Sequence, residues 1–221
     1  KAKIIAGTGT YSTSESIEIT KMADSLGVDG IMIVTPYYSK PSQHGILRHF
    51  EEISKITDLP IMAYNIPGRT STLIELETLQ TLVDDIGIHS IKDAVGDFEF
   101  SKKQLELLKD KVDIYSGNDN QTYDFVINGG VGVVSVASHV VGDEIFEMIS
   151  FAKDNDLEKA EEINMQLSNL FEAIFEEPSP GPIKKILSES WEEVGEPLLP
   201  ITSITPESVS YTHLTLPTSP H

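Results

Sequence analysis

The stretch IHSIKDAVGD, residues 88–97, indicates a short strand that ends in a lysine. The apolar residues Ile88 and Ile91 lead to Lys92, and small residues with a glycine follow, which is typical of a turn. Parallel α/β folds keep their functional side chains at the carboxyl ends of the strands. An amine at such a position can attack a ketone and form an imine. Lys92 is therefore our candidate nucleophile.

Apolar strands alternate with amphipathic helices on both sides of this stretch. We expect strands at 3–6, 30–34, 60–64, 88–92, 112–116 and 132–136, and helices at about 12–26, 42–56, 75–83, 100–108, 121–127, from 142 onward, and 156–175. Pro182 fits the first turn of one more helix. Strands and helices that alternate in this way predict a parallel sheet built from six βα units.

The strand before Lys92 also ends in residues with useful chemistry. It finishes at Tyr64 and runs into a loop that contains Arg69. A phenol can relay protons, and a guanidinium can hold a carboxylate. Each residue alone has a more ordinary interpretation: a solvated loop lysine, a core tyrosine or a surface ion pair. Because all three fall at predicted strand ends, their grouping favours a class I aldolase.

Four motifs carry a resemblance to a known family. They are VTPYYSKPSQHG (34–45), YNIPGRT (64–70), IKDAVGD (91–97) and YSGND (115–119). In order and spacing, from Ile5 to about Thr205, the chain resembles the dihydrodipicolinate synthase family. The resemblance implies an eight-stranded (β/α) TIM barrel that binds pyruvate as an imine, without a cofactor, and condenses it with aspartate semialdehyde on the route to diaminopimelate and lysine. It further implies a homo-oligomer, a dimer or a tetramer, and the composition described below favours a cytoplasmic enzyme.

The resemblance also assigns roles position by position. Lys92 becomes the imine-forming residue and Tyr64 the proton relay beside it. Tyr38 matches a tyrosine that reaches across a dimer interface into the neighbouring active site, and Arg69 matches the residue that grips the carboxylate of the semialdehyde. Two further positions, expected to line the pyruvate pocket, are Gly117 and Val134.

Two alternatives stay open beside this function. The first is another pyruvate-dependent aldolase, such as a keto-sugar acid lyase or a sialic acid lyase; the sialic acid lyases resemble the pattern but carry a non-basic residue in place of Arg69. The second is a non-catalytic relative that uses the barrel as a scaffold. The presence of Lys92, Tyr64 and Tyr38 argues against the scaffold.

A regulatory difference follows from the same resemblance. In lysine-inhibited members the segment after the GTG turn presents an asparagine to the inhibitor. Here Tyr11 stands at that place, and Glu15 is retained one helical turn later. We expect a bulky phenol to obstruct that pocket, so feedback inhibition by lysine should be weak or absent.

Composition excludes several classes of function. The chain has 221 residues, 16 Lys and Arg against 35 Asp and Glu, a net charge of −19 and no cysteine. Nucleic acid is an improbable partner because its binding depends on basic residues. We expect no disulfide, membrane span or secretory signal. No metal site is expected, since the histidines lack companions at ligand spacing, and no glycine-rich phosphate loop indicates a nucleotide cofactor.

The expected domain organisation has three parts. Residues 1–155 form a partial barrel, corresponding to units three to eight; residues 156–208 form a C-terminal helical extension; and residues 209–221 resemble a translated sequencing adaptor. The first two units of the family carry a Gly-Thr-Thr-Gly-Glu loop, which has no equivalent here. We therefore expect the polypeptide as written to fold poorly and to lack measurable synthase activity.

Overall fold

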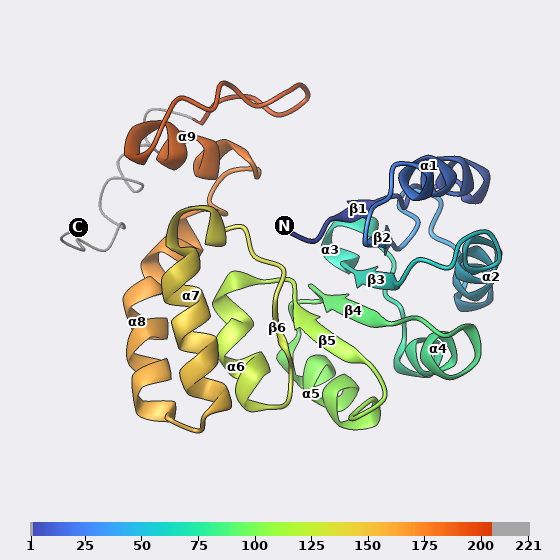
Figure 1. Cartoon of the computed structure of the whole chain (residues 1–221), viewed down its shortest axis with the longest axis horizontal. Helices are drawn as coiled ribbons and strands as arrows, with labels where there is room; N and C mark the ends of the chain where they lie inside the picture. The colour runs from blue at the N-terminus through green and yellow to red at the C-terminus, as the bar shows by residue number, and fades with distance from the viewer. Residues whose placement is uncertain (1, 205–221) are drawn as a thin grey trace. The chain divides into compact units, whose positions relative to one another are not determined.

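The computed structural model describes residues 2–204 (Figure 1), so the expected tail at 209–221 lies outside the described residues. The chain forms two compact units, which we describe separately. Unit 1 comprises the residues up to Asn118 together with Asn128–Val133. Unit 2 comprises Asp119–Ile127 and the residues from Val134 onward.

Unit 1 is built on one parallel sheet of six strands in the order β1-β2-β3-β4-β5-β6. The strands are β1 (Ile5–Gly7), β2 (Gly30–Val34), β3 (Ile61–Asn65), β4 (Ser90–Asp93), β5 (Asp113–Ser116) and β6 (Gly132–Val133). Every neighbouring pair is parallel. The predicted parallel α/β sheet is therefore confirmed, although β6 is shorter than expected.

Helices connect these strands on the outer side of the sheet (Figure 1). They are α1 (Thr13–Ser25), α2 (Gln43–Ser54), α4 (Leu76–Thr81), the π-helical η1 (Leu82–Ile86) and α5 (Phe98–Leu107). The single turn α3 (Pro67–Thr70) lies instead in the loop that follows β3 (Figure 1). The start of α1 follows the predicted cap, because the Ser12 side chain accepts a hydrogen bond from the Glu15 backbone N–H. Ser42 caps α2 in the same way through Gly45.

The core of unit 1 lies between the central strands and the helices. Ile31, Ile33 and Ile91 of the sheet are fully buried, as are Phe50 and Ile53 of α2. Strands that are covered on both faces consist of near-continuous apolar residues. This pattern explains why polar residues in β3 and β4 fall at the strand ends, where the site is found.

Unit 2 is helical. It contains the 3₁₀ turn η2 (Asp119–Gln121), α6 (Thr122–Ile127), α7 (Ser138–Lys153), α8 (Leu157–Ala173) and α9 (Gly181–Ser190). Val126, Met148, Ala152 and Ala160 form an apolar cluster that joins α6, α7 and α8. Pro182 lies in the first turn of α9, as predicted.

Two predictions near the junction of the units are wrong in detail. The helix expected from Gly142 begins at Ser138, and the non-helical Val141 (φ −132°) separates its first turn from the rest. The strand expected at 132–136 stops at Val133. The backbone N–H groups of Val136 and Ala137 donate instead to the carboxylate of Asp119, at 3.0 and 3.2 Å. The Asp119 side chain, in the 3₁₀ turn η2 that follows β5, therefore takes the Val136 donor that a longer strand would have used.

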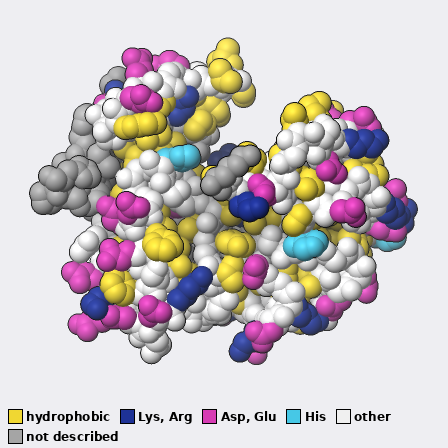
Figure 2. All heavy atoms as spheres, viewed as in Figure 1, with side chains coloured by type: hydrophobic (Ala, Val, Ile, Leu, Met, Phe, Trp, Pro, Cys, Tyr) yellow, Lys and Arg dark blue, Asp and Glu magenta, His cyan; other side chains and the backbone are white. Residues whose placement is uncertain are grey.

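Charged side chains are dispersed over the visible surface (Figure 2). Many pair within one helix, such as Arg48 with Glu52 at 3.0 Å and Lys159 with Asp156 at 2.6 Å. Such exposed pairs stabilise a fold only slightly. Among residues 2–204, no helix is long and apolar enough to cross a bilayer.

Candidate active site

Tyr64 and Lys92 are neighbours at the ends of β3 and β4. They pair in register across the two parallel strands. The Lys92 Nζ atom lies 4.0 Å from the centroid of the Tyr64 ring, which is a cation–π distance. Both side chains are half-buried. The sheet therefore sets a primary amine against a phenol, as the sequence predicted for these two strand ends.

The environment of Tyr64 keeps its phenol protonated. Burial raises the pKa of Tyr64, and the positive charge of Arg69 acts in the opposite direction with a smaller effect. A neutral phenol at physiological pH carries an O–H that can donate a hydrogen bond or a proton.

Arg69 lies on α3, in the loop that follows β3. Its side chain is exposed. Asn65 closes the base of this loop, because its side-chain amide donates to the Ile74 carbonyl and its side-chain oxygen accepts from the Ile74 N–H, both at 3.0 Å. Thr70 tightens the tip, since its hydroxyl bonds the Thr72 carbonyl at 3.0 Å. The exposed guanidinium of Arg69 is therefore carried by a loop whose shape is fixed by hydrogen bonds.

Gly117 approaches Lys92 more closely than any other residue type could. Its N–H donates to the Asp93 carbonyl at 2.6 Å. A Cβ at this position would lie 2.8 Å from the Ala94 Cβ and 3.1 Å from the Lys92 Cε. Real Cβ atoms essentially never come within 3.0 Å of another heavy atom, so the site requires glycine here. Gly117 thus forms one wall beside the amine.

The two remaining predicted residues are Tyr38 and Val134. Tyr38 is 92% exposed and has a left-handed backbone (φ 68°). Its neighbour Tyr37 instead makes an edge-to-face contact with Tyr11, with ring centroids 5.8 Å apart. Val134 belongs to unit 2, whereas the other five predicted residues belong to unit 1.

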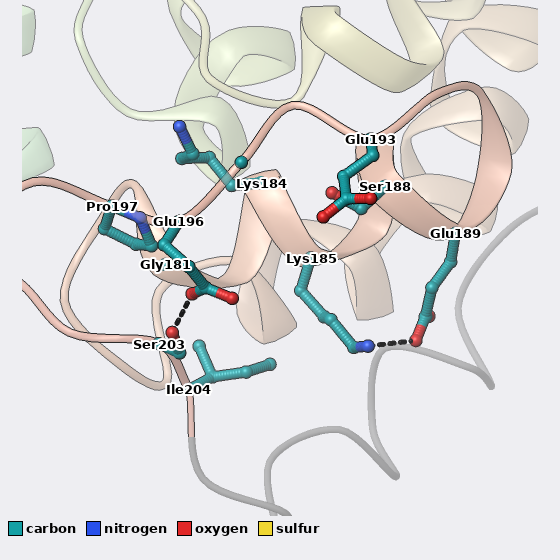
Figure 3. Close-up of a pocket in the computed structure, with 11 residues that line it drawn as sticks. Gly181, Lys184, Lys185, Ser188, Glu189, Glu193, Glu196, Pro197, Ser203 and Ile204 are labelled. Carbon is teal, nitrogen blue, oxygen red and sulfur yellow. Dashed lines mark hydrogen bonds and ion pairs between the residues drawn. The ribbon is translucent and has the colours of Figure 1, made fainter.

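A cavity of about 540 Å³ lies in unit 2, between α9 and residues 193–204 (Figure 3). Lys185 pairs with Glu189 at 2.8 Å on its wall, and Ser203 bonds Glu196. None of the predicted site residues lines it. We therefore place the candidate active site at the strand ends of unit 1.

Clusters of side chains that could act as metal ligands were sought among residues 2–204. Among these residues, no group of three or more His, Cys, Asp or Glu side chains could hold a metal ion. His49 is buried in α2, and its Nδ1 atom lies 2.9 Å from the Thr13 hydroxyl. Burial lowers the pKa of His49 to about 4, so this imidazole is neutral at physiological pH.

Sequence reasoning missed three buried polar residues that end the site strands. Asn65, Asp93 and Ser116 are at most 1% exposed. They form one row across β3, β4 and β5, since Asn65 pairs with Asp93 and Asp93 with Ser116. A polar residue that closes an otherwise apolar strand is a signal that could have found them.

Comparison with known proteins identifies the family. The sequence model of the dihydrodipicolinate synthetase family matches residues 1–217. The chain belongs to this family. A 4-hydroxy-tetrahydrodipicolinate synthase from Thermosynechococcus vestitus is 46% identical over 211 residues, which are 95% of this chain and 71% of that protein. The family member described here is accordingly a lyase of diaminopimelate and lysine biosynthesis.

Solved structures of dihydrodipicolinate synthases have the same fold. The enzyme from Bacillus anthracis is 38% identical, with a TM-score of 0.94 over 100% of this chain and 75% of that one. The enzyme from Acinetobacter baumannii, solved in complex with pyruvate, is 34% identical, with a TM-score of 0.93 over 97% of this chain and 74% of that one. Both relatives are longer than this chain.

Proposed function

We propose that this family member condenses pyruvate with aspartate semialdehyde to give 4-hydroxy-tetrahydrodipicolinate, and that Lys92 forms the imine. The observation that carries the proposal is the Lys92 amine set 4.0 Å from the Tyr64 ring at two adjacent strand ends. The relative solved with pyruvate supports pyruvate as the first substrate. Members of one family at these identities share a fold in which the strand ends coincide.

The chemistry follows from these groups. The deprotonated Lys92 amine attacks the ketone carbon of pyruvate, and loss of water leaves an imine. Loss of a proton from the methyl carbon gives an enamine, which attacks the aldehyde carbon of the semialdehyde and forms the new C–C bond. The amino group of the semialdehyde then attacks the imine carbon, closes the ring and releases Lys92. Tyr64, as a neutral phenol, passes protons to and from these centres.

The other predicted residues receive supporting roles. Arg69 holds the carboxylate of the semialdehyde, for which a planar guanidinium is suited. Gly117 and Val134 line the pyruvate pocket. Tyr38 contributes to the site of a neighbouring subunit in a cytoplasmic dimer or tetramer. Its 92% exposure and its left-handed backbone support a role outside its own subunit.

We also infer that β1–β6 correspond to six consecutive strands of an eight-stranded barrel, with helices beyond residue 155 as a C-terminal extension. Support comes from the consecutive parallel strand order and from relatives that share the fold over about three quarters of their own length. Two βα units taken from a relative and joined before Lys1 would then close the barrel. We call this protein the completed barrel.

Borohydride trapping in the completed barrel tests the proposed function. Pyruvate with borohydride should add one reduced pyruvyl group to the unchanged protein, located on Lys92 by peptide mass analysis. Lys92→Ala and Lys92→Arg should both abolish the adduct and the condensation, because neither side chain can form an imine. An adduct that persists in either variant would refute the assignment of Lys92.

A further inference from the structure

The row of buried polar residues Asn65, Asp93 and Ser116, the polar row, lies one residue beyond Tyr64 and Lys92. Its members occupy the same level across β3, β4 and β5. Successive side chains of a strand point to opposite faces of the sheet. The polar row therefore faces away from Tyr64 and Lys92 and has no direct access to their substrate.

Each member of the polar row binds the loop that follows its own strand. Asn65 holds the loop that carries Arg69. Ser116 exchanges two hydrogen bonds with the backbone of Asn118, at 2.7 and 3.1 Å. Buried polar groups are costly unless they are hydrogen-bonded, so a satisfied row at this position indicates a structural task. Asp93 makes the largest number of these contacts.

Asp93 joins the end of β4 to the turn and the helix that come after it. One carboxylate oxygen accepts from the Val95 N–H at 2.8 Å. The other accepts from the Ser101 hydroxyl at 2.9 Å and from the Gln104 side-chain amide at 3.2 Å, both on α5. One side chain, adjacent in sequence to Lys92, thus fixes the strand end against two other segments.

The backbone of Asp93 transmits this restraint to Lys92. Its carbonyl accepts the 2.6 Å hydrogen bond from Gly117, whose Cα lies so near Lys92 that a Cβ would come within 3.1 Å of the Lys92 Cε. On its other side, the amine stands 4.0 Å from the Tyr64 ring. A displacement of the strand end by about 1 Å would drive Lys92 against Gly117 or away from Tyr64, and shifts of this size slow catalysis strongly.

We propose that Asp93 is a positioning residue for Lys92: its buried carboxylate holds the end of β4 so that the amine stays between Tyr64 and Gly117. The inference rests on the proposed function, in which Lys92 forms the imine. Asp93 acts through the backbone and through α5, and it does not contact the substrate.

The test compares the rate of borohydride trapping at saturating pyruvate in variants of the completed barrel. Asp93→Ala should slow trapping roughly 10- to 100-fold while the half-saturating pyruvate concentration changes little. Asp93→Asn should stay within about threefold of the unchanged protein, because its side-chain oxygen can still accept from Val95. Its amide can donate to the Gln104 Oε1, which has no partner among the described residues, once the Gln104 side-chain amide rotates by half a turn. Ser101→Ala removes one hydroxyl only and should give a smaller loss, which keeps the test informative if Asp93→Ala does not fold.

Leu108→Ala is the matched control for stability. Leu108 is fully buried at the end of α5, so its truncation destabilises the same helix without touching the Asp93 carboxylate. It should lower the melting temperature and leave the trapping rate unchanged. The positioning role would be overturned if Leu108→Ala slowed trapping as much as Asp93→Ala does. It would also be overturned if Asp93→Asn trapped pyruvate as slowly as Asp93→Ala. Absence of trapping in the unchanged completed barrel would instead refute the proposed function, and this inference with it.

Discussion

At the scale of single residues, we expect Arg69 to separate the proposed function from that of the sugar-acid lyases. Arg69→Leu in the completed barrel should leave pyruvate trapping nearly intact and lower kcat/KM for aspartate semialdehyde roughly 10- to 100-fold, the range expected when a charge-assisted hydrogen bond is lost. Trapping and steady-state condensation assays check this. A variant that loses trapping as severely as Lys92→Ala would show that Arg69 supports the barrel or the first substrate.

Tyr11 carries a second prediction at this scale, on feedback by lysine. Its ring packs edge-to-face on Tyr37, with ring centroids 5.8 Å apart, at the place where the family resemblance implies an asparagine in lysine-inhibited members. The completed barrel should therefore keep its activity in millimolar lysine. Tyr11→Asn should make the activity sensitive to lysine by opening the pocket, with Glu15 left in place. Micromolar inhibition of the unchanged protein would contradict this prediction.

At the scale of elements, the contact between α1 and α2 should respond to pH through His49. The folded protein binds a proton on this imidazole only near pH 4, whereas the unfolded chain does so near 6.5. Between these values the unfolded state holds more protons, so stability falls as the pH is lowered. The loss should reach about 2 kcal/mol between pH 7 and pH 5.

Denaturant unfolding of the completed barrel at both pH values measures this loss. His49→Gln should remove most of it, because glutamine does not titrate. His44→Gln, which changes an exposed histidine on the same helix, should leave it in place. An unchanged pH dependence in His49→Gln would show that other groups cause the effect.

The elements also show which features could be predicted from sequence. The strand at 30–34 and the pairing of Tyr64 with Lys92 follow from apolar patterning and from the rule that parallel strands end at one edge. The shortening of β6 does not, because it depends on Asp119, which is distant in sequence and takes the donors of Val136 and Ala137. Local patterns locate the strands, whereas contacts between loops decide where the strands stop.

The candidate site also contains some residues that the sequence identifies and others whose roles only the structure shows. Lys92, Tyr64 and Arg69 could be proposed because their side chains have recognisable chemistry. Asn65 and Asp93 could be noticed only as polar residues that close apolar strands, since their roles lie in hydrogen bonds to backbone groups of Ile74 and Val95 that only the folded chain brings near.

At the scale of the whole molecule, the unpaired edge of β1 predicts that the solubility of the fold depends on further strands. Among residues 2–204, β1 pairs with β2 alone, and its first residue Ile5 and the preceding Ile4 are more than half exposed. On the adjacent α1, Met22 and Leu26 are 62% and 77% exposed. Unpaired strand edges and exposed apolar side chains promote aggregation.

The 221-residue chain alone should therefore be poorly soluble and inactive, and the completed barrel should be soluble, melt cooperatively and turn over substrate. Size-exclusion chromatography, calorimetry and the condensation assay compare the two proteins. The Lys92→Ala variant of the completed barrel should melt cooperatively but not turn over substrate. This control separates a loss of folding from a loss of catalysis. Clear turnover by the 221-residue chain alone would contradict the inferred architecture.

The consecutive strand order also bears on how the chain acquires its structure during synthesis. Each strand from β2 to β6 pairs with the strand that left the ribosome just before it. Contacts between consecutive βα units close with a smaller loss of chain entropy than contacts between distant units. The sheet can therefore grow in one direction, one βα unit at a time, while translation continues. The amine of Lys92 would meet the ring of Tyr64 as soon as β4 emerges, well before the helices of unit 2 exist.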